Sequence, residues 1–276
     1  MTASNDLILW ETRDQVTTLT MNNPRKLNGW TMDMLVALRE ALKKAADDAD
    51  TRALILTGAD PYYCAGVNLS AVISPGHPAK LHAFIAEQNE SLFEMFLSFP
   101  KPILIAVNGP AIGASVTSAT LCDAIVASEK ATFSTPFAKL GVTPEGCSSE
   151  LFPKLIGEKN TKRMLGEEGW QPTGVEAAEI GLVDHVFRHE VLMDEAHALA
   201  KSWIEDDRKR TFKAGMSADE LRKVNARESQ DLAYAFLAPK FLQGQYDFLK
   251  SKGKTGPAMV FKSLLLTRPL WSRLLP

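Results

Sequence analysis

Apolar and polar residues follow two different periods along the first 190 residues. Residues 16–21 alternate apolar and polar positions, which is typical of a half-buried strand, and the Asn22-Asn23-Pro24 run ends it. Thr31 offers an N-cap for a helix. Its apolar residues recur on one stripe at Met34, Leu35, Leu38, Ala41, Leu42 and Ala45. Residues 53–57 are uniformly apolar and short, so we predict a buried parallel strand.

The same order of strand and helix then repeats. A loop from 58 to about 78 leads to a helix near 80–98. Two further buried strands at 103–107 and 123–128 flank a helix of small residues at 113–121, and residues 181–187 are typical of a strand leading into a turn. This alternation predicts an α/β core with a mainly parallel sheet. From about 190 onward the chain is more charged and has helical spacing at 192–204 and 218–236, so we predict a separate helical layer.

Composition narrows the class of protein. The chain has 276 residues, of which 45% are apolar and 23% charged, which suits one large or two small domains. A net charge of −2 gives no bulk attraction to nucleic acid. The chain has an odd number of cysteines, Cys64, Cys122 and Cys147, which favours reduced thiols over a disulfide framework. No apolar run reaches the roughly 20 residues of a membrane span. We therefore expect a soluble intracellular protein.

Common chemical motifs are missing. Gly253-Lys254-Thr255 resembles the end of a P-loop, but Phe248 stands where that loop needs its first glycine. No dinucleotide fingerprint follows a strand. The segment 113–117 lacks the second glycine of a nucleophile elbow. The five histidines form no metal-ligand pattern, and Cys147 has no recognisable histidine partner. Kinases, dehydrogenases, serine hydrolases and zinc enzymes are thus poorly supported, and we predict no metal site.

Three loops carry the remaining chemical signal. Residues 62–69 and 108–115 each follow the carboxyl end of a buried strand, where α/β sheets place ligands. Gly66 and Gly113 each precede an ordinary residue, so a backbone N–H can turn towards a cleft. The second turn also begins a helix, whose dipole favours negative charge there. The third loop, 140–147, carries one carboxylate, Glu145, among apolar and small neighbours, where its pKa would rise.

These loops belong to a set of segments that resembles the crotonase (enoyl-CoA hydratase/isomerase) superfamily over roughly residues 7–252. The matching segments, in order and spacing, are 23–28, 64–69, 101–113, 122–123 and 131–133. The resemblance implies an α/β fold, a spiral of ββα units with C-terminal helices used in trimerisation. It also implies an acyl-CoA thioester substrate and an oxyanion hole made by the backbone N–H groups of Val67 and Ala114. We expect residues 1–195 to form the spiral core with binding and catalysis, and 196–276 to form the helical region for oligomerisation.

The carboxylates distinguish between the reactions of this family. Its hydratases use two glutamates, whose positions are occupied here by Thr117 and Phe137. The turn 143–149 instead resembles that of the peroxisomal-type Δ3,Δ2-enoyl-CoA isomerases, whose single catalytic glutamate falls on Glu145. The resemblance therefore implies an isomerase that moves a 3,4 double bond of an enoyl-CoA to the trans-2 position. Alternatives are another crotonase reaction (hydratase, dienoyl isomerase or thioesterase) and a non-catalytic acyl-CoA- or RNA-binding scaffold.

The resemblance also points to residues that bind the substrate. Those nearest the catalytic turns are Ala65, Gly66, Asn68, Leu69, Gly113 and Phe137. Arg25, Lys26 and Leu27 would contact CoA, although a basic pair after a proline turn is also typical of a solvated edge. Phe248, Lys250 and Lys252 match the place where the family contacts a nucleotide phosphate, at times across a subunit boundary. No cofactor is expected, because coenzyme A is part of the substrate.

Assembly and compartment rest on the same resemblance. We expect a homotrimer or a dimer of trimers that binds no nucleic acid. The peroxisome is favoured by resemblance alone, because Ser272-Arg273-Leu274 stands two residues before the end of the sequence; the mitochondrial matrix and the cytoplasm are alternatives. The extra tail from about 253 is apolar and basic over 260–275. We predict an added helix that covers a subunit interface, with a membrane-surface patch as the alternative.

Overall fold

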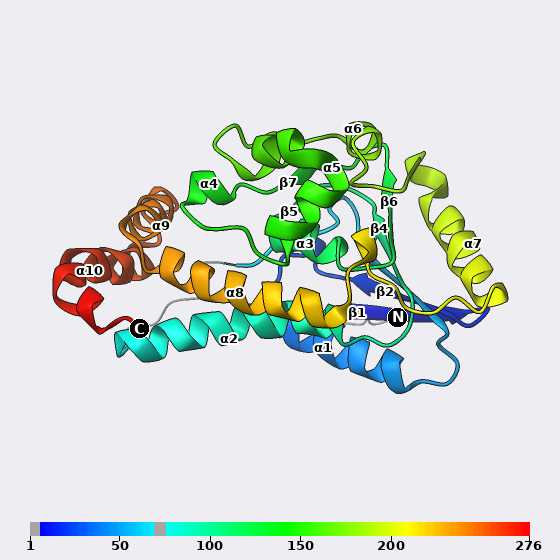
Figure 1. Cartoon of the computed structure of the whole chain (residues 1–276), viewed down its shortest axis with the longest axis horizontal. Helices are drawn as coiled ribbons and strands as arrows, with labels where there is room; N and C mark the ends of the chain where they lie inside the picture. The colour runs from blue at the N-terminus through cyan, green and yellow to red at the C-terminus, as the bar shows by residue number, and fades with distance from the viewer. Residues whose placement is uncertain (1–5, 69–75) are drawn as a thin grey trace.

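The computed structural model describes residues 6–68 and 76–276, and it is an α/β protein built on one six-stranded sheet (Figure 1). The strand order is β1-β2-β3-β4-β6-β8. Their bounds are β1 Ile8–Arg13, β2 Val16–Met21, β3 Ala53–Gly58, β4 Ile103–Val107, β6 Ala124–Ser128 and β8 His185–Phe187. Only the β1–β2 pair is antiparallel, so the predicted mainly parallel sheet is confirmed. The edge strand β1 was not predicted.

The chain repeats a unit of long strand, short strand and helix. β4 leads to β5 (Ala111–Ile112) and α3 (Ala114–Ala119), and β6 leads to β7 (Phe133–Ser134) and α4 (Phe137–Leu140). β5 and β7 pair in parallel as a second small sheet. The other helices are α1 Met32–Asp47, α2 Pro78–Leu97, α5 Ser148–Leu165, α6 Gly174–Glu179, α7 Leu192–Glu205, α8 Ala218–Phe236, α9 Pro239–Ser251 and α10 Thr255–Trp271. This repetition is the expected ββα spiral.

The two faces of the sheet are covered by different helices. α7 covers one face, where Trp203 and Ala196 join the buried side chains of β3 and β4 in one apolar cluster. α1, capped by Thr31 as predicted, contributes Met34 and Leu38 to the larger cluster on the other face. The expected boundary at residues 195 and 196 falls inside α7, a helix that packs on the sheet.

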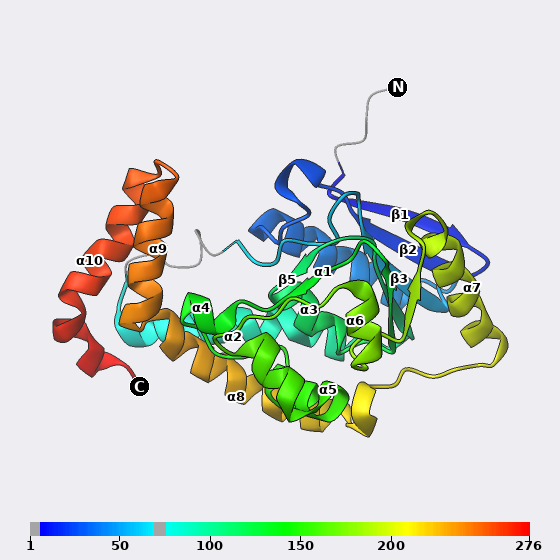
Figure 2. The ribbon, with the colours of Figure 1, turned by 90° about the horizontal axis from the view of Figure 1, so that it is seen from above.

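α2 and α8 lie side by side along the molecule (Figures 1 and 2). The amide of Asn89 donates to Ser229 Oγ at 3.0 Å, and Arg222 Nε donates to Glu94 Oε1 at 3.0 Å. His82 of α2 is buried between these helices, with its ring 4.2 Å from the ring of Tyr234. This layer forms one wall of the cavity described below.

The last two helices pack on each other at the end of the molecule farthest from the large sheet (Figure 2). The ring of Phe241 stacks on Phe236 at 4.4 Å and meets Phe261 edge-on at 6.4 Å. The predicted added helix is therefore present as α10, and it packs against α9 of its own chain. Its outer residues Leu266 and Leu270 are exposed. Of the helices in the described ranges, none combines the length and apolar character needed to cross a bilayer.

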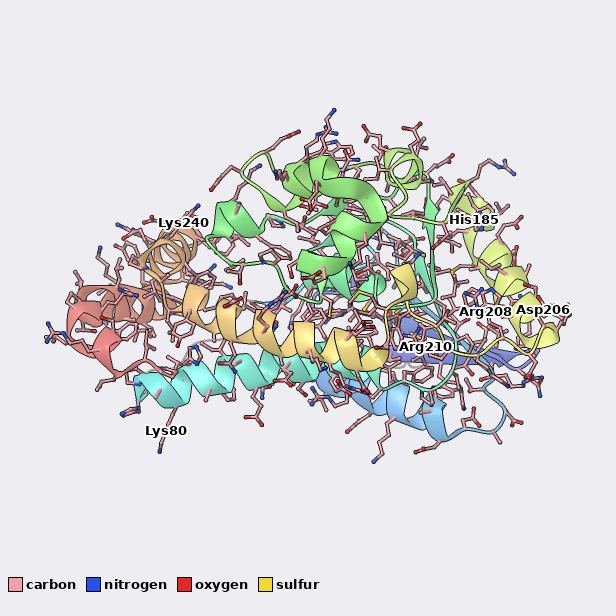
Figure 3. All side chains as sticks on the ribbon, viewed as in Figure 1. Lys80, His185, Asp206, Arg208, Arg210 and Lys240 are labelled. Atoms are coloured by element: carbon pink, nitrogen blue, oxygen red, sulfur yellow. The ribbon has the colours of Figure 1, made fainter. Side chains whose placement is uncertain are left out.

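A buried ion pair ties the segment after α7 to the core (Figure 3 labels Arg210). Arg210 Nη1 donates to Asp123 Oδ2 at 2.7 Å, and both side chains are almost fully buried. Arg210 Nη2 also donates to the carbonyl of Leu121 at 2.6 Å, while Asp123 accepts the N–H of Ile103 at 2.8 Å. The pair therefore joins β4, the end of α3 and the start of the helical layer.

Candidate active site

A cavity of about 840 Å³ lies between α1, α2 and α8 on one side and the two glycine turns on the other. Eight of the residues predicted for the site line it, namely Ala65, Gly66, Val67, Asn68, Gly113, Ala114, Phe137 and Glu145. They come from three separate loops and the start of two helices. The ββα spiral thus brings together residues that are far apart in the sequence.

The two glycine turns are joined directly to each other. Cys64 and Ala111 form a parallel bridge, and the N–H of Ile112 donates to the carbonyl of Cys64 at 3.0 Å. Gly66 has a φ of +76° and Gly113 a φ of +63°, conformations that side chains rarely adopt. This backbone conformation directs the chain after each glycine towards the cavity.

Two backbone donors remain available at these turns. The N–H of Val67 and the N–H of Ala114 have no acceptor among residues 6–68 and 76–276. The neighbouring groups are used: the N–H of Gly113 donates to Ser134, and the carbonyl of Gly66 accepts from Trp30. Ala114 is the first residue of α3, but α3 has only six residues, so its dipole adds little and the N–H itself is the relevant group.

Glu145 lies in the loop between α4 and α5 and is one of the residues that line the cavity. Its backbone carbonyl is held by Ser148, whose N–H donates at 3.2 Å and whose hydroxyl donates at 2.7 Å. Its carboxylate has no hydrogen-bond partner in the part of the chain that the structure describes, and the residue is 9% exposed. Burial raises the pKa of Glu145 to about 8, and the nearby Glu228 carboxylate adds to this rise. The arrangement is that of a base in an apolar site.

The rest of the wall is mainly apolar and was not predicted. It includes Leu81, Ile85 and Leu92 of α2, and Leu232 and Phe236 of α8. Asp33 also lines the cavity but lies on the exposed surface of α1, so Glu145 is the buried acid there. The helical spacing of apolar residues in α2 and α8 predicts that each helix buries one face. This spacing does not indicate whether the buried face lines a cavity or packs in a filled core.

The structure separates other predicted residues from the cavity. Arg25 and Lys26 are exposed in a short 3₁₀ helix, η1 (Pro24–Lys26), and Leu27 follows it. This segment adjoins the first turn, since Leu27 accepts the N–H of Ala65 at 3.0 Å. Three predicted residues at the end of α9 are outside the cavity lining: Phe248 and Lys250 of the helix, and Lys252, its C-cap residue. Leu69 falls outside the described residues.

The hydratase positions have clear structural roles. Thr117 is fully buried, and its hydroxyl donates to the carbonyl of Ala114 at 3.3 Å. A Cβ on Gly146 would lie 2.6 Å from Thr117 Oγ1, so Thr117 packs directly under the turn that carries Glu145. Phe137 is 3% exposed and lines the cavity. Both positions carry packing groups in place of carboxylates, and of the two only Phe137 lines the cavity.

A second, polar hollow of about 440 Å³ lies between the β1–β2 pair and α7. There His189 Nε2 lies 3.2 Å from Asp60 Oδ2, and His189 Nδ1 lies 3.2 Å from Ser128 Oγ. This is the order of groups in a hydrolytic triad, but Ser128 is fully buried and accepts the N–H of Lys130 at 3.0 Å. Ser128 is not among the residues that line this hollow, so it is not placed to act as the nucleophile of a triad there. Within residues 6–68 and 76–276 no group of three or more His, Cys, Asp or Glu could hold a metal ion.

Comparisons with known proteins agree with the fold. The family described as enoyl-CoA hydratase/isomerase matches residues 11–252. Human "Enoyl-CoA delta isomerase 2" is 35% identical over 87% of this chain, and mouse "Enoyl-CoA delta isomerase 3, peroxisomal" is 36% identical over 71%. The match spans 62% of the length of each of these two relatives. The crystal structure of an enoyl-CoA hydratase/isomerase from Pseudoalteromonas atlantica T6c is 27% identical, has a TM-score of 0.74, and covers 89% of this chain and 97% of its own.

Proposed function

Because this chain belongs to the enoyl-CoA hydratase/isomerase family, we propose that it is a Δ3,Δ2-enoyl-CoA isomerase. It would move a 3,4 double bond of an enoyl-CoA to the trans-2 position. The observation that carries the proposal is that a single buried carboxylate, Glu145, lines the same cavity as the unpaired N–H groups of Val67 and Ala114. Two relatives whose names contain "Enoyl-CoA delta isomerase" support the same choice.

In this mechanism Glu145 moves one proton. Its ionised carboxylate accepts the proton from C2 of the bound thioester. The electron pair of that C–H bond forms a C1–C2 double bond and the carbonyl π electrons move onto the thioester oxygen, which gives a dienolate that still has its 3,4 double bond. The same carboxyl group then donates the proton to C4; the 3,4 π electrons take this proton, the C1–C2 pair becomes the new 2,3 double bond, and the thioester carbonyl reforms. Both carbons can lie on one face of the acyl chain, so one acid is sufficient. A pKa near 8 makes Glu145 a stronger base than an ordinary carboxylate.

The negative charge of the dienolate would rest on the thioester oxygen. The N–H groups of Val67 and Ala114 would donate to that oxygen, each contributing roughly 3 kcal/mol, as deletion of oxyanion-hole donors in other enzymes indicates. They are backbone groups held by the bridge between Cys64 and Ala111, so they need little reorganisation during the reaction. The reaction requires no cofactor, because coenzyme A is part of the substrate.

Water addition is the less favoured reaction. A hydratase of this family needs two carboxylates to hold and activate water, and the two positions carry Thr117 and Phe137. Phe137 and the apolar wall formed by α2 and α8 disfavour an ordered water beside the acyl chain. The unpaired N–H donors and the raised pKa of Glu145 are typical of a reactive site. They therefore argue against a non-catalytic binding scaffold.

Binding of CoA and assembly complete the proposal. Arg25, Lys26 and Leu27 adjoin the first turn and would hold the nucleotide end of CoA, with Lys250 and Lys252 reaching a phosphate from a neighbouring subunit. We propose a homotrimer or a dimer of trimers, supported by the exposed apolar residues of α10. A peroxisomal location is supported by the name of the mouse relative, "Enoyl-CoA delta isomerase 3, peroxisomal". Light scattering would give the oligomeric state.

The test is direct. The protein is incubated with 3-hexenoyl-CoA and 3-dodecenoyl-CoA, and the absorbance of the conjugated thioester is followed. We expect isomerisation with the wild-type protein and a loss of about 10³-fold or more in kcat with Glu145→Gln, because no base remains. Glu150→Gln is the matched control, since that residue pairs with Arg227 on the surface nearby. Near wild-type isomerisation by Glu145→Gln would refute the assignment.

A further inference from the structure

Glu228 is a buried carboxylate that the proposed mechanism does not use. It lies on α8, is 3% exposed and does not line the cavity. Its Oε2 accepts the N–H of Cys147 at 2.7 Å, and its Oε1 accepts the N–H of Ser149 at 2.9 Å. Both oxygens thus accept hydrogen bonds, which is the geometry of an ionised carboxylate.

These two N–H groups belong to the turn that carries Glu145. Cys147 is the N-cap residue of α5, and its side chain makes no capping hydrogen bond. The Glu228 carboxylate, which comes from α8, accepts the N–H groups at this helix terminus instead. Cys147 also has a left-handed φ of +63°, and its thiol donates to the carbonyl of Leu221 of α8 at 3.2 Å. The backbone directly after Glu145 is therefore held by a different helix.

We propose that Glu228 is the positioning residue of this site: by binding the N–H groups of Cys147 and Ser149 it fixes the turn that carries Glu145 and keeps a negative charge beside that group. The effect of Glu228 on kinetics rests on the proposed function. The interaction between the Glu228 and Glu145 carboxyl groups does not, because it can be measured in the protein without substrate.

The charge next to Glu145 comes from few groups. Glu228 is the charged neighbour that raises the pKa of Glu145 beyond the effect of burial. On α8, Arg227 is turned outward to Ser149 Oγ and Glu150, at 3.1 and 3.3 Å. On α5, burial raises the pKa of the Cys147 thiol, so it stays neutral.

The wall opposite α8 carries charged groups of its own, since Lys80 of α2 and Arg39 of α1 line the cavity. On α2, Glu94 is paired with Arg222, and burial lowers the pKa of His82, which keeps that ring neutral at pH 7. Burial raises the pKa of Glu228 itself, while the bonds from Ser149 and Cys147 act in the opposite direction. The two N–H groups that its oxygens accept favour the ionised form of Glu228, and its negative charge acts on Glu145.

Two substitutions separate charge from position. Glu228→Gln removes the charge and one of the two hydrogen bonds. Glu228→Asp keeps the charge but draws the carboxylate back by one methylene, about 1.5 Å. Glu94→Gln is the control, because it removes another carboxylate of the same helical layer whose partner is Arg222. Circular dichroism and gel filtration check that each variant is folded.

The primary measurement is a pH titration of the Glu145 carboxyl carbon by ¹³C NMR in glutamate-labelled full-length protein. The signal is identified by its absence in Glu145→Gln. We expect Glu228→Gln to lower the midpoint of Glu145 by about one pH unit, as for other carboxylates that lose a charged neighbour. Glu228→Asp and Glu94→Gln should leave the midpoint close to the wild-type value. An unchanged midpoint in folded Glu228→Gln overturns the inference.

The second measurement is the kinetics of 3-enoyl-CoA isomerisation. We expect kcat of Glu228→Asp to fall about tenfold or more with KM unchanged, because small displacements of a catalytic group are costly. The acidic limb of the kcat/KM profile should move to lower pH in Glu228→Gln only. Wild-type kcat in Glu228→Asp would overturn the positioning role, even if Glu228→Gln failed to fold. Absence of wild-type isomerisation together with a shifted NMR midpoint would refute the proposed function but leave the carboxylate interaction standing.

Discussion

The carbonyl oxygen of Ile112 occupies the space that a side chain on Gly66 would need: a Cβ built on Gly66 lies 2.4 Å from it. The two turns of the proposed oxyanion hole are therefore in backbone contact, one turn filling the space left by the other's glycine. Gly66 is required both for its φ of +76° and for this close approach.

We predict that Gly66→Ala separates the two turns. The activity should fall by about 10²-fold or more, the loss measured when an oxyanion donor is removed elsewhere. The free energy of unfolding should fall by more than the roughly 1–2 kcal/mol that a left-handed residue costs alone. Urea unfolding and the isomerisation assay measure the two effects.

Gly253→Ala is the matched control for this prediction. Gly253 has a similar φ of +70° but no heavy atom within 4 Å of its built Cβ. It should therefore show only the conformational cost and keep full activity. Equal losses of stability and activity in both variants would contradict a role for the contact with Ile112.

Burial of Glu145 should make stability depend on pH. The pKa of this group rises from an ordinary value of 4.5 to about 8 in the folded protein. Between these values the native state binds the proton that the unfolded state has lost, so stability falls as pH rises from about 5 to 8 and levels off above 8. Above pH 8 the loss in the free energy of unfolding reaches at most about 5 kcal/mol, since one pKa unit corresponds to about 1.4 kcal/mol.

Glu145→Gln removes this titration. We expect the variant to be more stable than the wild type at pH 8.5 and of similar stability at pH 5, as measured by urea unfolding at constant ionic strength. The difference between the two proteins isolates Glu145 from the other groups that titrate. A difference that is the same at both pH values would show that the Glu145 carboxyl is not buried as described.

Much of the core was predictable because burial constrains it strongly. Residues 53–57 and 103–107 lie under helices on both faces, and a strand of that kind must be uniformly apolar. β1 was missed because it is an edge strand with mostly exposed or half-exposed residues, so its pattern is weakly constrained. Thr31 was recognisable as an N-cap because that role needs only local sequence.

The site was predictable only in part. The glycines of the two turns and the isolated Glu145 stand out locally, and the resemblance gave them roles. Glu228 was not predicted, although it stands in the same helical stripe as the buried Leu221, Val224 and Leu232, a spacing that could have identified a charge facing the core. Its partner, the N–H of Cys147, is 81 residues away, and nothing local identifies a contact of that range.

The basic pair of η1 offers a test of CoA binding. Arg25 and Lys26 are exposed and contribute nothing buried to the fold, so replacing both with Ala should change stability by less than about 0.5 kcal/mol. If they hold a phosphate of CoA, KM should rise several-fold with kcat unchanged, and the difference from the wild type should shrink at high salt. Lys43→Ala with Lys44→Ala on α1 serves as a control of equal charge change. An equal rise in KM with both pairs would indicate a general field effect.

The buried pair of Arg210 and Asp123 should be costly to break from one side. Arg210→Met leaves Asp123 buried with its charge uncompensated and removes the donor to the carbonyl of Leu121, so we expect a loss of about 3–5 kcal/mol in the free energy of unfolding. Arg208→Met is the control, because Arg208 is exposed and its guanidinium lies over the ring of Trp203 at 4.5 Å, an interaction that contributes about 0.5–1 kcal/mol. Adding Asp123→Asn to Arg210→Met should recover part of the loss, since the uncompensated charge is then removed while the N–H of Ile103 keeps an acceptor. Additive losses in the double variant, measured by urea unfolding, would show that the two side chains act independently and that the ion pair is not what holds the helical layer to the sheet.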